Sequence, residues 1–152
     1  MHDSRTIANE ILRVAEAHGN SLTPMQLLKL AYIAHGWSLG LYGNPLISND
    51  VQAWQYGPVI PDLYNAVKNF RGRPVQFPIE GAPHGDVLTP AEANLIRQVV
   101  QLYGDKSGPA LSRLTHAPGT PWAQVYEDGT FGIDIPNDII EDHYKRLAKE
   151  RA

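Results

Sequence analysis

Residues 23–43 read TPMQLLKLAYIAHGWSLGLYG, and this stretch decides the fold. Thr23 followed by Pro24, with Gln26 three positions after the threonine, is typical of a capped helix start, and Gly43 can end the helix in the left-handed conformation. Apolar residues follow the 3.6-residue period and also fill positions between, so the helix is apolar around most of its circumference. We therefore expect it at the centre of the molecule, with other helices packed around it.

Two features of this central helix predict its packing. Trp37 lies among apolar residues and is assigned to the core. The spacing Gly36-x-x-x-Gly40 places two small residues one turn apart, which favours the close approach of a second helix rather than nucleotide binding.

Amphipathic segments on both sides of the central helix predict the rest of the fold. Most of these segments begin with a capping residue or a proline, and most are followed by a glycine or a proline. We expect an all-α single domain over residues 1–152, with about six helices and one or two short extended segments. The helices are expected at residues 4–18, 23–42, 61–70, 89–103, 107–116 and 137–148, a further turn or two at 121–125, and extended pieces at 51–56 and 75–77.

Composition excludes several classes of protein. The chain has 152 residues, 13 Lys and Arg, 16 Asp and Glu, and no Cys. Without cysteine it cannot be a disulfide scaffold, a cysteine enzyme, a zinc finger or an iron–sulfur protein. A net charge of −3 argues against nucleic acid as a partner. No targeting segment or membrane span is predicted, so we expect a cytoplasmic protein that does not bind membranes, and a homo-oligomer stays open.

The sequence offers little for catalysis or metal binding. Its six histidines lack the spacing of metal ligands, so neither a metal nor a cofactor is expected. His35 is expected to be a core histidine with one ring nitrogen hydrogen-bonded. Ser112 and His116, four residues apart on one predicted helix, lack an orienting third group and oxyanion donors in the local sequence. We therefore assign no catalytic residue, and an enzyme built on these three residues stays as an alternative.

Bulky aromatic residues stand beside rigid turns in two segments. Trp54 and Tyr56 precede residues 57–61, GPVIP, and His116 precedes a proline-rich turn that ends at Trp122. Aromatic residues in such places either close the end of a core or anchor a protein partner. Both interpretations stay open for the two tryptophans.

Four segments, in this order, resemble the Panacea-domain antitoxins, a phage-associated family that includes SocA-type proteolytic adaptors. They are residues 25–37 (MQLLKLAYIAHGW), 53–64 (AWQYGPVIPDLY), 111–122 (LSRLTHAPGTPW) and 135–144 (IPNDIIEDHY). Gln26, Leu28 and Ala31 depart from the residues common in that family, so the identity of the partner is not inherited.

The resemblance implies a helical domain that neutralises a cognate toxin by direct contact, without catalytic residues. In SocA-type members the same contact delivers the toxin to a ClpXP-type protease. A transcriptional regulator is a further alternative, although no predicted helix carries a basic recognition face. The residues that we expect to bind the toxin are Trp54, Gln55, Tyr56, Gly57, Pro58, His116 and Trp122.

Overall fold

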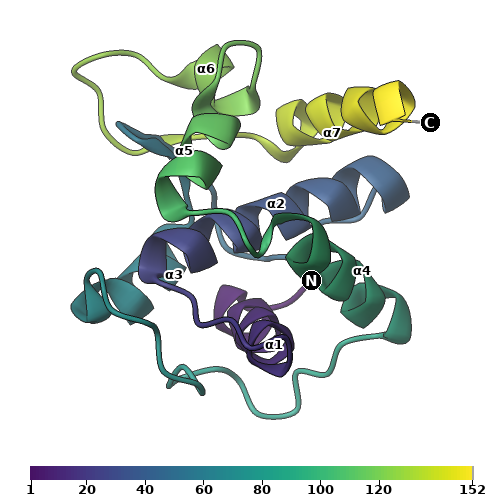
Figure 1. Cartoon of the computed structure of the whole chain (residues 1–152). Coiled ribbons are helices and arrows are strands. Elements are labelled where there is room, and N and C mark those ends of the chain that lie inside the picture. The colour runs from purple at the N-terminus through teal and green to yellow at the C-terminus, as the bar shows by residue number, and fades with distance from the viewer. Residues whose placement is uncertain (152) are drawn as a thin grey trace.

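The computed structural model describes residues 1–151 and shows helices gathered around α2, with a small antiparallel sheet beside them (Figure 1). The helices are α1 (Ser4–Ala17), α2 (Pro24–Tyr42), α3 (Pro61–Val67), the 3-10 turn η1 (Lys68–Phe70), α4 (Pro90–Tyr103), α5 (Gly108–His116), α6 (Pro121–Val125) and α7 (Asn137–Arg151). The strands are β1 (Gln52–Trp54), β2 (Gly57–Val59) and β3 (Ile133–Asp134).

The expected all-α architecture is confirmed in its helices and corrected in its sheet. The chain is mainly helical, but α6 is a helix of its own, and three strands pair in the order β2-β1-β3. The register pairs Ala53 of β1 with Pro58 of β2 and with Ile133 of β3. Residues 75–77 form no strand. Because β3 has only two residues and pairs across some 80 positions of sequence, no local pattern reveals it.

Helix α2 is the centre of the fold, as its sequence predicts. The capping box of Thr23 and Gln26 is present, and Gly43 ends the helix at φ 69°. Every residue from 27 to 39 is buried, because α1, α4, α5 and α7 all pack against this helix (Figure 1).

The glycine pair of α2 accommodates α7, as predicted. A Cβ at Gly40 would lie 2.6 Å from the Tyr144 Cβ, and one at Gly36 would collide with the Tyr144 ring. That ring also meets Trp37 edge-on, with centroids 5.1 Å apart. Trp37 is only 7% exposed, so its assignment to the core is confirmed.

The N-terminus is held by a buried histidine. His2 contacts Asp86 through Nδ1 at 2.5 Å and Glu92 through Nε2 at 2.9 Å. Burial lowers the pKa of His2, but hydrogen bonds to the two carboxylates outweigh it and raise that pKa overall. Burial raises the pKa of Asp86 and Glu92. Their hydrogen bonds, including those with His2, outweigh burial, so the pKa of each carboxyl group is lowered overall.

Stability should therefore depend on pH through His2. A histidine whose pKa is raised by folding stabilises the fold fully below its ordinary value of ~6.5 and loses that contribution as pH rises through the folded-state pKa. The advantage of the wild type over His2→Gln, measured by urea unfolding, should be largest near pH ~6 and shrink by pH ~9. It should also fall below pH ~4, where Asp86 and Glu92 become protonated. An advantage that does not change with pH would contradict this account.

Between residues 1 and 151, no helix combines the length and the apolar character needed to cross a bilayer.

Candidate protein-binding site

The strands β1 and β2 form a tight hairpin that contains the predicted site residues. Trp54 pairs with Gly57, which leaves Gln55 and Tyr56 as a two-residue loop. Gly57 adopts φ 123°, a conformation that side chains disfavour. A Cβ there would also lie 2.8 Å from the Lys29 amine. Glycine is therefore required at this position.

Side chains from three helices fix the hairpin by hydrogen bonds to its carbonyl groups. The donors come from α2, α5 and α6, which are distant in sequence from the hairpin. The hairpin is therefore held by three separate helices. Trp122 Nε1 donates to the Trp54 carbonyl at 2.6 Å, Ser112 Oγ to the Tyr56 carbonyl at 2.7 Å, and Lys29 Nζ to the Pro58 carbonyl at 2.9 Å and the Tyr56 carbonyl at 3.4 Å.

Lys29 supports the hairpin, and the sequence analysis did not assign it to this site. It is 4% exposed, and none of the ion pairs in the described part of the chain includes it. Burial lowers the pKa of Lys29 to about 8. The available signal was a single charge within α2, because no other residue of that helix is Asp, Glu, Lys or Arg.

The lowered pKa of Lys29 predicts a gain of stability at alkaline pH. The unfolded chain holds the lysine proton up to pH ~10.4, whereas the folded chain loses it near pH 8, so stability should rise with pH between these values. Relative to the Lys29→Met variant, the free energy of unfolding should rise by about 3 kcal/mol over this range, since one pKa unit corresponds to ~1.4 kcal/mol. Urea unfolding of both proteins across this range measures it. Parallel pH profiles would show that Lys29 keeps an ordinary pKa.

Ser112 and His116 are arranged to support the hairpin. The Ser112 hydroxyl donates to the Tyr56 carbonyl, and His116 Nδ1 donates to the Ser112 carbonyl. Nδ1 lies 3.4 Å from Ser112 Oγ, but a nitrogen that already carries its proton cannot accept one from the serine. In this arrangement the two side chains do not form a nucleophile–base pair.

His35 is buried and bonded through both ring nitrogens, where one was expected. The Ile47 amide donates to His35 Nδ1 at 3.2 Å, which places the proton on Nε2, and Nε2 donates to Asn137 Oδ1 at 3.0 Å. Burial lowers the pKa of His35.

No group of three or more potential ligands among residues 1–151 is arranged to hold a metal ion. The carboxylates at His2 contact opposite ring nitrogens and so do not converge.

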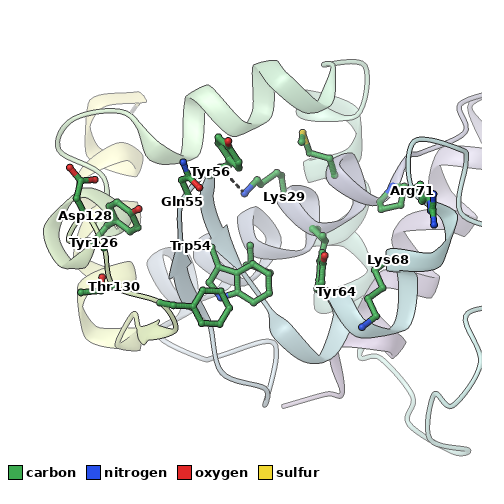
Figure 2. A pocket seen from close by; sticks show the side chains of 16 residues that line it. Lys29, Trp54, Gln55, Tyr56, Tyr64, Lys68, Arg71, Tyr126, Asp128 and Thr130 are labelled. Atoms are coloured by element: carbon green, nitrogen blue, oxygen red, sulfur yellow. Dashed lines mark hydrogen bonds between the residues drawn. The ribbon is translucent and has the colours of Figure 1, made fainter.

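A groove of about 920 Å³ runs along one side of the hairpin (Figure 2). Its middle is apolar and aromatic, with Trp54 and Tyr64 prominent in Figure 2. Lys68 and Arg71 lie at one end of the groove and Asp128 at the other. This volume is near the upper limit of ~300–1,000 Å³ for ligand pockets, so the groove has room for more than one side chain.

Exposed apolar side chains gather around this groove. Tyr56 is 68% exposed, Phe131 78% and Met25 42%, and all three line it. Trp54 lies between Tyr64 and Phe131, with ring centroids 5.0 and 5.1 Å away. Large apolar residues clustered on a surface are typical of an interaction site.

The structure separates the predicted site residues into three groups. Trp54, Gln55 and Tyr56 line the groove, whereas Gly57 and Pro58 are buried behind it. His116 and Trp122 are half-buried, do not line the groove, and pack edge-on against each other with centroids 5.3 Å apart. The groove residues that sequence reasoning missed, besides Lys29, include Met25, Tyr64, Lys68, Arg71, Tyr126, Asp128 and Phe131.

Comparison with known proteins identifies the family. The model of the SocA-like antitoxins with a Panacea domain matches residues 27–123, from α2 into α6. Antitoxin SocA of Caulobacter vibrioides (strain NA1000 / CB15N) is 31% identical over 155 residues, which cover 94% of this chain and 82% of that protein. No solved structure matches. The chain therefore belongs to the SocA-like family of antitoxins with a Panacea domain.

Proposed function

We propose that this protein neutralises a cognate toxin by direct protein–protein contact through the hairpin loop and the groove beside it. The observation that carries the proposal is the exposure of Tyr56 and Phe131 at a groove whose hairpin is fixed by three helices. Membership of an antitoxin family supports a toxin as the partner.

The rigidity of the hairpin favours binding. A loop that already has its bound conformation loses little entropy when a partner docks. Tyrosine and tryptophan are enriched among the residues that dominate interface energies; here Tyr56 lies in the loop and Trp54 ends the strand before it. The buried Gly57 and Pro58 contribute by shaping the loop and not by touching the toxin.

In the fuller form of the proposal, the bound toxin passes to a ClpXP-type protease in the cytoplasm. The resemblance to SocA-type adaptors is its basis. The toxin's half-life, followed after synthesis is stopped, distinguishes the two forms. Delivery shortens the half-life only in cells that contain ClpX, whereas occlusion leaves it unchanged while growth is still rescued.

The test of neutralisation uses the product of the gene adjacent to the one encoding this chain. That product is expressed from an inducible promoter, alone and together with this protein. We expect it to arrest growth alone, the co-expressed pair to grow, and the two proteins to co-purify. If the neighbouring product is toxic and this protein neither rescues growth nor binds it, the proposed function is wrong for that pair.

A further inference from the structure

The charges that line the groove differ from those of the whole chain. The chain has 13 Lys and Arg against 16 Asp and Glu. The groove lining instead contains Lys29, Lys68 and Arg71 against Asp128 as its single acid. Because Asp128 lies at the far end, the end formed by α3 and η1 is locally positive on an acidic protein (Figure 2).

Lys68 and Arg71 are available to a partner. Both are exposed, and neither takes part in an ion pair within residues 1–151. Arg71 is the one non-glycine residue described with a positive φ, 56°, and it follows η1 directly. Lys29 differs from both, since its amine is already used by the hairpin carbonyls.

The middle of the groove suits a large apolar side chain. Leu28 and Val59 are buried residues that reach its surface, and Trp54 and Tyr64 add aromatic faces. Burial of an apolar side chain of the partner against them would stabilise a complex through the hydrophobic effect. The groove thus combines an apolar site with two unpaired cations at one end.

We infer that this groove binds an extended segment of the toxin in which a large apolar side chain is adjacent to acidic residues, with the acids facing Lys68 and Arg71. The apolar side chain supplies affinity against Trp54 and Tyr64. The acidic residues set the direction of the segment and speed association, as complementary charges do at interfaces. This inference rests on the proposed antitoxin function and adds the chemistry of the partner.

The test selects random peptides displayed on phage with the full chain as bait. Peptides with an aromatic or branched apolar residue beside Asp or Glu should be enriched. Synthetic copies should bind about tenfold more weakly to the Lys68→Glu/Arg71→Glu variant. The control variant Arg97→Glu/Lys106→Glu reverses two exposed charges outside the groove lining and should bind as the wild type does. Synthetic peptides whose acidic residues are replaced by Lys should bind the Lys68→Glu/Arg71→Glu variant again.

Several results would overturn the inference. The inference is wrong if the selection yields no peptide whose binding depends on Trp54. It is also wrong if the selected peptides lack acidic residues, or if they bind both charge variants equally. Groove-dependent binding of a single-stranded oligonucleotide in place of peptides would also overturn it.

Neutralisation assays separate this inference from the proposed function. If the wild type and Lys68→Glu/Arg71→Glu rescue growth equally, the inference fails and the antitoxin function stands. If neither rescues growth while acidic peptides still bind, the function fails instead.

Discussion

Replacing Tyr56 with Ala, or Gln55 with Arg, is expected to abolish rescue from the cognate toxin while the protein melts at its normal temperature. Both side chains are exposed in the hairpin loop, and the contacts that fix this loop use backbone carbonyls, which the substitutions leave in place. Loss of an aromatic anchor at an interface typically costs ~2–4 kcal/mol, or a factor of ~30 or more in affinity. The arginine adds a charge where the contact surface must dehydrate.

The control variants make the same kinds of substitution at exposed positions outside the hairpin. Tyr42→Ala removes another exposed tyrosine, 54% exposed at the end of α2, and Gln101→Arg adds the same charge on exposed α4. Both controls should rescue growth fully. Full rescue by Tyr56→Ala and Gln55→Arg would place the contact surface elsewhere on the protein. Unfolding of both would show that the hairpin loop only closes the end of the core.

The sequence predicted most of the fold because its central helix has strong local signals. The capping box at Thr23 and the near-continuous apolar character of α2 need no knowledge of the neighbours. The Gly36 and Gly40 pair even indicated that another helix would lie close, though not that Tyr144 would be the residue in contact. Local chemistry therefore predicted the elements and one of their contacts.

The edges of the apolar stripes were predicted less well. In α4, the helical period that puts Leu95 and Val99 on the buried face would also place Leu102 there, but Leu102 is 59% exposed and Val100 is buried instead. Leu41 and Leu114, which the same period places with the apolar residues of α2 and α5, are 50% and 46% exposed. A residue at the edge of a stripe satisfies the helical period on either side. Which edge is buried depends on where the neighbouring helices lie, and that is a property of the whole fold.

The candidate site was predicted only where it is contiguous in sequence. Residues 54–56 are consecutive at the end of β1 and in the hairpin loop, and their proximity to GPVIP made them visible. Phe131 and Tyr64 come from other segments and meet Trp54 only in the folded chain, where Lys68 lines the same groove. No spacing rule connects them, so a groove between distant elements has no signature in a single sequence.

Helix α2 connects stability with the candidate site. One part of it packs Gly40 and Trp37 against α7, and Lys29 nearer its start holds the hairpin. Loosening of the α2–α7 packing therefore lowers the stability of the element that carries the site. A substitution in this packing should reduce neutralisation through unfolding and not through lost contacts with the toxin.

Trp37→Ala is expected to destabilise the protein by about 3–5 kcal/mol, as for other buried aromatic residues, out of a total stability of roughly 5–15 kcal/mol for a domain. Trp37 is 7% exposed and meets Tyr144 edge-on, and its Nε1 donates to the Tyr103 hydroxyl at 3.2 Å. Alanine removes all of these contacts and leaves a cavity between α2 and α7. Urea unfolding measures the loss, and neutralisation should fail at the growth temperature and return on cooling.

Trp37→Phe separates packing from hydrogen bonding in the same place. Phenylalanine keeps an aromatic ring against Tyr144 and loses the bond to Tyr103, so it should cost only about 1–2 kcal/mol and still neutralise the toxin. Leu114→Ala, at a site 46% exposed, should change stability by less than about 0.5 kcal/mol. If Trp37→Ala is as stable as the wild type yet fails to bind the toxin, this face of α2 belongs to the contact surface. Graded losses in the order Leu114→Ala, Trp37→Phe and Trp37→Ala, with binding retained by every folded variant, place it in the core.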